Sequence, residues 1–239
     1  MLLDIHSHIL PAVDDGAFDI SESLRLLEAM RLQGITDVIA TPHFYPLDDN
    51  FNEYKERISN AYNLLLKETA NKNLPRIFVG SEVLYYRYIG TSETVYELCL
   101  NRSQYLLLEL TDECICKEFF DDIDNLVNKQ RIIPIIAHLE RYRNAKNYKK
   151  LLKYIKDNGI LAQINASSLF SQSSRRATER LIRGGYVNFI ATDAHSMKSR
   201  PPMMKPALEY IAENIGAGYA SGFIRNSQIL LEKITGDNL

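Results

Sequence analysis

The sequence is poor in the features that mark several common classes of protein. Its 239 residues include only three cysteines, Cys99, Cys114 and Cys116. A disulfide framework is therefore not expected, and a reducing cytoplasm is the expected compartment. No apolar run approaches the roughly 18 residues of a membrane-spanning helix, and the N-terminus lacks the basic and apolar regions of a secretion signal. We expect neither membrane insertion nor export.

An excess of charge of one sign is also missing. The chain has 28 Lys and Arg against 30 Asp and Glu, a formal net charge of −2, and no long basic or acidic block. Nucleic acids and anionic membranes require a basic surface, so we expect no nucleic-acid partner. The length suits one large α/β domain or two small ones. Because no repeat or linker interrupts the sequence, residues 1–239 are expected to form a single domain; the oligomeric state stays open.

The chain does contain a regular alternation of strand and helix patterns. Seven short, mostly apolar runs are typical of strands buried on both faces: residues 2–5, 36–41, 76–80, 105–108, 131–137, 160–164 and 187–191. Helical patterns follow them, including one at 91–101 and a final one at 227–235. This alternation predicts parallel strands with right-handed crossovers, in either a barrel or an open sheet.

All five histidines lie at the ends of predicted strands. In an extended chain, residues two apart point to the same side, so His6 and His8 can reach one metal ion. Two acids, Asp14 and Asp15, follow them in a loop. The other candidates at strand ends are His43, Glu82, Glu109, His138, Asp193 and His195. Taken singly, each could be a capping residue, a solvated acid or a satisfied core histidine. Together they favour a barrel, in which the C-terminal strand ends converge on one mouth.

These residue types indicate metal-assisted hydrolysis. Nitrogen and oxygen ligands without cysteine suit divalent Zn, Mn or Fe, and the set is large enough for two or three ions with a bridging carboxylate. Close metal pairs are suited to the hydrolysis of phosphate esters. Arg141 and Arg200 closely follow His138 and His195, and a guanidinium group matches phosphate oxygens with two hydrogen bonds. A surface salt bridge is the alternative role for each arginine.

These segments together resemble the polymerase-and-histidinol-phosphatase (PHP) superfamily, and more closely its capsule-type bacterial tyrosine phosphatases, the CpsB/YwqE group. The matching stretches are 4–11 with 14–16, 39–43, 80–82, 107–109, 137–142, and 191–195 with 200–202. The His-x-His motif occurs throughout the superfamily. The segments that point to the phosphatase group are Asp14-Asp15-Gly16, His138-Leu139-Glu140-Arg141-Tyr142 and Arg200-Pro201-Pro202.

The resemblance implies a fold, a metal centre and an activity. The fold is a distorted TIM-like barrel of seven βα units, and the cofactors are two to three divalent ions, most often manganese, with iron or zinc as alternatives. The implied ligands are His6, His8, Glu82 and Asp193 for the first metal, Glu82, Glu109 and His138 for the second, and Asp15, His43 and His195 for the third. The family pattern alone selects Asp15, which leaves Asp14 as a support for a neighbouring ligand.

The implied activity is hydrolysis of phosphotyrosine on proteins, with Arg141 and Arg200 holding the phosphate. The implied substrate is a bacterial tyrosine kinase that regulates capsule or exopolysaccharide synthesis. A small-molecule PHP phosphatase, such as a histidinol-phosphate phosphatase, is the main alternative. A PHP nuclease would need a track of basic residues, which this sequence lacks. A non-catalytic module stabilised by metal would not need two arginines. The stretch Tyr85-Tyr86-Arg87-Tyr88 departs from the family pattern, and its tyrosines either pack at the rim or receive a peptide.

Overall fold

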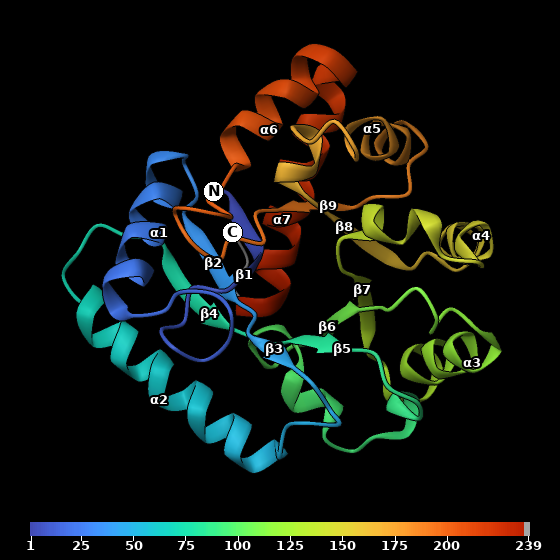
Figure 1. Cartoon of the computed structure of the whole chain (residues 1–239), viewed down its shortest axis with the longest axis horizontal. Helices are drawn as coiled ribbons and strands as arrows, with labels where there is room; N and C mark the ends of the chain where they lie inside the picture. Colours follow the sequence, from blue (N-terminus) through green and yellow to red (C-terminus); the bar gives the residue numbers. More distant parts are fainter. Residues whose placement is uncertain (237–239) are drawn as a thin grey trace.

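The structure is a computed structural model that describes residues 1–236. Strands and helices alternate along the chain as predicted (Figure 1). The strands are β1 (Leu3–Ser7), β2 (Asp37–Ala40), β3 (His43–Phe44), β4 (Arg76–Val79), β5 (Glu82–Leu84), β6 (Tyr105–Glu109), β7 (Ile133–Ile136), β8 (Leu161–Asn165) and β9 (Phe189–Ala191). The α-helices are α1 (Ile20–Leu32), α2 (Phe51–Thr69), α3 (Lys117–Asn125), α4 (Tyr148–Asn158), α5 (Arg175–Arg183), α6 (Met204–Ile211) and α7 (Ala217–Thr235).

The strands form a curled parallel sheet, which confirms the predicted fold class. Their order is β1-β2-β4 in one ladder and β3-β5-β6-β7-β8-β9 in the other, and every pair is parallel. A bridge between Ser7 and Ala194 joins the first strand to the end of the last. β2 and β3 are successive parts of the second predicted strand, and β4 and β5 of the third. Seven strand positions therefore surround the barrel, two of them interrupted.

Each interruption has a physical cause. Pro42 separates β2 from β3, and proline has no backbone N–H to donate to a ladder. Gly80 separates β4 from β5, where the chain passes against Leu100; a Cβ on Gly80 would lie 2.7 Å from a Leu100 methyl carbon and 3.0 Å from its Cα. These breaks distort the barrel on one side.

One end of the curled sheet is packed with apolar side chains. A buried cluster joins residues from five strands to helix α7, which lies behind the strands in Figure 1. Its strand members are Leu3, Ile5, Ile39, Leu107, Ile135, Phe189 and Ala191, and its helix members are Leu230, Leu231 and Ile234. Asn226 and Gln228 of α7 donate to the carbonyls of Asn188 and Met1, which precede β9 and β1, so α7 covers the N-terminal end of these strands. A larger apolar cluster fills the space between the strands and the outer helices.

Two helix predictions were wrong in detail. Residues 91–101 were expected to form one helix, but the segment contains separate 3₁₀ turns that end in η3 (Leu100–Arg102). Asn101 and Arg102 have φ values of +47° and +55°, a left-handed backbone that no α-helix contains. The final helix α7 begins at Ala217, ten residues before the predicted start.

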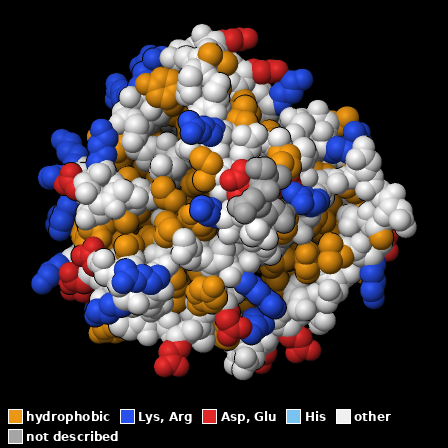
Figure 2. Space-filling view, turned by 180° about the vertical axis from the view of Figure 1, so that it is seen from behind, with side chains coloured by type: hydrophobic (Ala, Val, Ile, Leu, Met, Phe, Trp, Pro, Cys, Tyr) orange, Lys and Arg blue, Asp and Glu red, His pale blue; other side chains and the backbone are white. Residues whose placement is uncertain are grey.

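The surface agrees with the sparse cysteines and balanced charge. Within residues 1–236, no helix is both long and apolar enough to cross a bilayer, and all three cysteines are unpaired. On the face shown in Figure 2, acidic and basic side chains are interspersed with hydrophobic ones, and none of the described histidines is visible there.

Candidate metal centre

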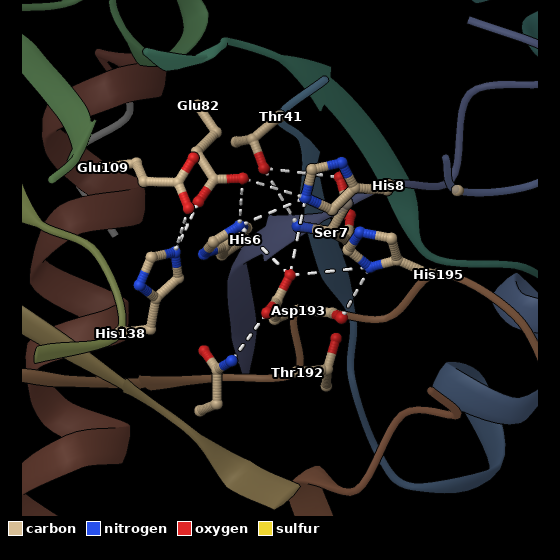
Figure 3. A network of polar contacts seen from close by, with 12 residues as sticks. His6, Ser7, His8, Thr41, Glu82, Glu109, His138, Thr192, Asp193 and His195 are labelled. Atoms are coloured by element: carbon tan, nitrogen blue, oxygen red, sulfur yellow. Dashed lines mark hydrogen bonds and ion pairs between the residues drawn. The ribbon is translucent and has the colours of Figure 1, made fainter. Parts of the chain in front are cut away.

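The five histidines meet at one end of the strands; Figure 3 shows His6, His8, His138 and His195, and His43 lies 3.1 Å from Glu82, which the figure also labels. His6 lies on β1 and His43 on β3, while His138 follows β7 and His195 follows β9 by four residues. Carboxylates come from the neighbouring strands, with Glu82 at the start of β5 and Glu109 at the end of β6. His43 and Glu82 are paired in register across the β3–β5 ladder. The sheet thus places residues from six strands or strand ends around one centre.

Glu82 is the common member of this centre. One of its oxygens, Oε2, lies 3.1 Å from His6 Nε2, 3.2 Å from His8 Nε2 and 3.1 Å from His43 Nδ1. Its other oxygen lies 2.8 Å from His138 Nε2. With Asp193, whose Oδ1 is 3.4 Å from His6 Nε2, these atoms outline a buried four-residue cluster, His6, His8, Glu82 and Asp193.

Two further clusters adjoin the first. Glu109 approaches His138 at 3.3 Å and His43 at 3.8 Å, beside the shared Glu82. On the other side, Asp15 Oδ1 lies 3.4 Å from His43 Nε2 and 3.2 Å from His195 Nε2. Ligand atoms that could hold an ion group as His43, Glu82 and Glu109, and as His8, Asp15, His43 and His195. His43 therefore stands in the group with Glu82 and Glu109 where the resemblance implied His138, although His138 Nε2 also lies within 3.3 Å of both acids. His8 belongs to two groups, one more than implied.

Several buried atoms of the centre have no hydrogen-bond partner among the described residues. They are His43 Nδ1, Glu82 Oε2, Asp193 Oδ1 and His195 Nε2. Burying a polar atom without a partner is costly, and four such atoms facing one another are not explained by packing. Nitrogen and carboxylate oxygen are the donors that divalent Zn, Mn and Fe take. The residues present therefore fit divalent metal ions.

The protonation states of Glu82, Asp193, His43 and His195 suit the same donors. Burial opposes the charged forms of His8 and His138, but hydrogen bonds to carboxylates raise the pKa values of both, so these two would release a proton on binding metal. Burial alone would raise the pKa values of Glu82 and Asp193, but the adjacent histidines, His6 foremost, lower both well below the usual range. Burial lowers the pKa of His195 to about 4, and repulsion from His8 adds to the effect. Burial and the same repulsion lower the pKa of His43 as well. At pH 7 the acids are thus ionised, and His43 and His195 keep free lone pairs.

Asp14 and Asp15 take different positions. Asp14 Oδ2 accepts a hydrogen bond from His8 Nδ1 at 2.7 Å, which turns the opposite ring nitrogen of His8 toward the cluster. Asp15 is exposed and faces the other histidines. The loop reaches His8 because Gly16 lies directly against it: a Cβ on Gly16 would be 2.2 Å from the His8 carbonyl oxygen. Any side chain at Gly16 would displace both acids.

The two arginines converge on a single atom. Arg141 and Arg200 each donate from Nη2 to Asp193 Oδ2 at 2.6 Å. Their side chains are 42% and 38% exposed, so both can be reached from solvent. Asp193 thus presents one oxygen to the histidines and the other to two guanidinium groups, and an anion at this edge would meet both positive charges.

The whole chain also matches a known family. Residues 2–232 match the family model for capsular polysaccharide synthesis, CpsB/CapC. The chain belongs to the CpsB/CapC family. It is 30% identical to the tyrosine-protein phosphatase YwqE of Bacillus subtilis, over 98% of this chain and 93% of YwqE. It is 31% identical to the tyrosine-protein phosphatase CpsB of Streptococcus agalactiae, over 97% of this chain and 98% of CpsB.

A solved structure extends the likeness to three dimensions. The chain superposes with a TM-score of 0.84 and 28% identity on a structure described with YwqE of Bacillus subtilis and CpsB of Streptococcus pneumoniae as unique metal-dependent tyrosine phosphatases. The match covers 97% of this chain and 95% of that one. The resemblance to the CpsB/YwqE group is confirmed, and so is the PHP-type fold.

In this CpsB/CapC chain, polar residues outside the predicted set hold the candidate ligands in place. Gln163 Oε1 accepts from the His138 backbone N–H at 2.8 Å and lies 3.3 Å from His6 Nδ1. Asn165 donates to Asp193 Oδ2 at 2.6 Å. The Tyr142 hydroxyl lies 3.0 Å from His138 Nδ1. Such partners fix the orientation of metal-binding side chains. Sequence reasoning missed them, although Gln163 stands out as an amide within an apolar strand.

The same contacts support a strained backbone. His138 and Asp193 have φ values of +33° and +50°, in a region that costs a non-glycine residue about 1–2 kcal/mol. Asp193 is held there by a 2.9 Å hydrogen bond from its N–H to the His6 carbonyl. In this CpsB/CapC fold, tight turns directly after β7 and β9 aim the two side chains into the centre.

The tyrosine-rich stretch divides into packing and exposed residues. Tyr85 donates to Asp122 at 2.9 Å and packs edge-on against Phe119, and Tyr86 is half-buried against the core. Tyr88 is exposed. Two of the three tyrosines therefore pack at the rim, and Tyr88 alone presents its ring to solvent.

Proposed function

We propose that this chain is a metal-dependent protein tyrosine phosphatase of the CpsB/YwqE type, a phosphoric monoester hydrolase. The observation that carries the proposal concerns the two oxygens of Asp193. Oδ1 faces the buried histidines without a hydrogen bond, and Oδ2 accepts from Arg141 and Arg200. Metal donors and phosphate-binding groups thereby lie side by side. The relatives named as tyrosine-protein phosphatases, which align over nearly the whole chain, support the same function.

The proposed metal ligands are the nine residues around Glu82. They are His6, His8, Glu82 and Asp193 for a first ion, Glu82, Glu109 and His138 for a second, and Asp15, His43 and His195 for a third. The spacing of the donor atoms and the buried atoms without hydrogen bonds support the first and third sets. For the second set, the support is that His138 Nε2 lies 2.8 Å from Glu82 and 3.3 Å from Glu109. We favour manganese, with iron and zinc as alternatives. Divalent ions bound there would supply Lewis acidity toward phosphate oxygens and a lower pKa for water.

Arg141 and Arg200 are the proposed catalytic side chains. Their guanidinium groups can leave Asp193 for the phosphate oxygens, because both side chains are partly exposed and reach the same edge of the centre. Fixed positive charge at that place stabilises the transition state more than the ground state when charge develops on these oxygens. Phosphotyrosine releases a phenol with a pKa of about 10, so departure of the leaving group makes a small demand on a protein acid.

The proposed substrate is a phosphotyrosyl protein, in the setting of capsule or exopolysaccharide synthesis a bacterial tyrosine kinase. A cavity of about 340 Å³ is lined by Arg141, Arg143, Asn165 and five serines among others. It offers polar contacts for the polypeptide around the phosphotyrosine. We place the enzyme in the cytoplasm, where three unpaired cysteines stay reduced. We also propose that residues 1–239 work as one domain.

Metal-resolved turnover tests the function. The chain is stripped with a chelator, reconstituted with Mn, Fe or Zn, and assayed on a phosphotyrosyl peptide and on histidinol phosphate. We expect activity on the peptide that disappears with chelator and survives alkylation of the thiols. Chelator-insensitive, alkylation-sensitive hydrolysis would refute the metal mechanism. A preference for histidinol phosphate would instead support a small-molecule phosphatase.

Phosphate binding is tested at Arg200. We expect Arg200→Ala to raise KM for the peptide and to weaken inhibition by inorganic phosphate, about ten- to a hundredfold, because one charge-assisted fork is lost. Lys205→Ala, an exposed cation on α6, is the matched control. Full activity in Arg200→Ala would remove that residue from the site.

A further inference from the structure

Tyr45 presents an aromatic ring beside the metal centre. It follows β3 directly, and its ring stacks on the imidazole of His43, with centroids 5.0 Å apart and planes inclined by 21°. The residue is 37% exposed. A large ring in this place has one region against a proposed metal ligand and another region open to solvent.

The backbone of Tyr45 is held by a tight turn. Its N–H donates to Asp49 Oδ2 at 2.8 Å, and its carbonyl accepts from the N–H groups of Asp48 and Asp49 at 3.0 and 2.8 Å. Asp49 is in turn paired with Arg57 of helix α2 at 2.9 Å. These contacts leave the main chain of Tyr45 little freedom, so the ring is positioned before any ligand arrives.

The ring and Arg200 both adjoin the same pair of proposed ligands. Arg200 approaches Asp15 at 3.8 Å, Asp15 approaches His43 at 3.4 Å, and the Tyr45 ring stacks on His43. An aromatic ester group on a phosphate bound beside this pair would gain contact area and ring–ring attraction by packing against Tyr45.

We propose that the Tyr45 ring forms one wall of the substrate site. The aromatic ring of the substrate packs against it, and this contact favours aryl over alkyl phosphates. This inference rests on the proposed phosphatase function and deepens it. The substrate class that the wall selects is a phosphate monoester of a phenol, presented flat against the exposed part of the Tyr45 ring. Tyr45 is a positioning residue here and takes no part in bond making or breaking.

The competing role for Tyr45 is structural. A ring stacked on His43 could simply shield that imidazole from water, and its removal would then weaken metal binding and lower activity on every substrate alike. The two roles predict different changes when the ring is removed. A wall for the substrate ring changes the ratio of aryl to alkyl binding, whereas a shield changes metal content and leaves that ratio unchanged.

The experiment measures inhibition by phenylphosphonate and methylphosphonate, which share the phosphonate group and differ in the ring. Bound metal per chain and kcat/KM for phosphotyrosine and phosphoserine are measured in parallel, on the metal-loaded full chain. The variants are Tyr45→Phe, Tyr45→Ala and, as matched control, Tyr219→Ala. Tyr219 lies on α7 and is 40% exposed, so the control removes a similarly exposed ring far along the chain from the centre.

We expect Tyr45→Ala to reduce the preference for phenylphosphonate about three- to tenfold, mainly through weaker phenylphosphonate binding, since an aromatic contact and its buried area are lost. The same variant should raise KM for phosphotyrosine more than it lowers kcat. Tyr45→Phe should keep the wild-type preference, and Tyr219→Ala should match wild type.

Three results would overturn the proposal. They are an unchanged aryl preference in Tyr45→Ala, an equal loss for both phosphonates, or a loss of bound metal that accounts for the change. A wild-type chain that binds metal but hydrolyses no phosphotyrosine would overturn the proposed function itself, which this design separates from failure at Tyr45.

Discussion

The two ends of the curled sheet are built from the same strands and have opposite chemistry. On β1, Leu3 and Ile5 join the apolar cluster under α7, whereas His6 joins the metal centre. On β6, Leu107 belongs to the apolar end and Glu109 to the polar one. A few residues along each strand therefore separate a packed interior from a group of buried charges.

The difference assigns stability to one end and chemistry to the other. The apolar end buries large side chains without polar atoms, which is the main favourable contribution to folding. The polar end keeps buried atoms without partners and two residues in left-handed backbone. Both features are unfavourable in the metal-free chain, so the apolar end must offset them. Changes at the two ends should accordingly have separable effects.

The largest effect is expected at Glu82. Replacing Glu82 by Gln keeps the shape but removes the one carboxylate that contacts four histidines. We expect kcat on a phosphotyrosyl peptide to fall about a thousandfold or more, because several kcal/mol of metal-dependent stabilisation are lost. Bound metal should fall as well, while the circular dichroism spectrum stays native.

The control for that change is Glu97→Gln, which alters an acid in an exposed ion pair with Lys55 and should leave activity and metal content unchanged. Wild-type turnover in Glu82→Gln would mean that the polar end does not depend on its central carboxylate.

At the apolar end, Leu231→Ala should have the largest effect on stability. Leu231 lies on α7 and is buried against the strand residues of the apolar cluster. Truncation of such a leucine costs about 2–5 kcal/mol. Urea unfolding should register this loss, while kcat per folded molecule remains that of wild type. Ile229→Ala, exposed on the same helix, should change stability by less than about 0.5 kcal/mol. A parallel loss of metal affinity in Leu231→Ala would show that the two ends are coupled.

The free energy of unfolding should depend on pH in the metal-free protein only, and the effect should be of intermediate size. Burial disfavours the charged form of His138, but hydrogen bonds to Glu109 and Glu82 raise its pKa to about 9. A raised histidine pKa stabilises the folded state below the unfolded value of about 6.5, and that stability is lost as the pH rises through 9. We expect the chelated protein to lose on the order of 2–3 kcal/mol between these limits in urea unfolding.

Two comparisons check the origin of this slope. His138→Gln should make it shallower but not abolish it, because hydrogen bonds to Asp14 and other acids raise the pKa of His8 as well, against the effect of burial. The metal-loaded wild type should lack the slope, since a ligating imidazole is neutral. A metal-free chain that becomes more stable between pH 6.5 and 9 would contradict the raised pKa of His138.

The sequence predicts the fold and the composition of the polar end because both follow from local patterns. Continuous apolar runs predict each buried strand, and the parallel arrangement then brings the strand ends together without further information. The helix predicted at 91–101 is wrong because its backbone is set by long-range packing. Gly80 is pressed against Leu100, and Asn101 and Arg102, which follow Leu100, have a left-handed backbone. The local periodicity of the sequence does not indicate either feature.

The support around the ligands could not be predicted for a related reason. Gln163 and Asn165 are recognisable as polar residues at the end of an apolar strand, but their partners His138 and Asp193 are 25 and 28 residues away. Only the closed sheet shows which polar group meets which. The positions of Asp14 and Asp15 are a sharper case, because neighbouring acids in one loop have identical chemistry and differ only in direction.

The smallest predicted effect separates these two acids. Asp14→Asn removes the charge that holds His8 Nδ1 without removing a proposed ligand, and loss of such a supporting contact costs about ten- to a hundredfold in metal affinity or activity. Asp15→Asn removes a proposed ligand from the group with His43 and His195. We therefore expect metal titration to give unchanged stoichiometry with weaker binding in Asp14→Asn, and one ion fewer in Asp15→Asn. The reverse outcome would make Asp14 the ligand, and it would mean that the short contact to His8 in the metal-free chain is replaced when metal binds.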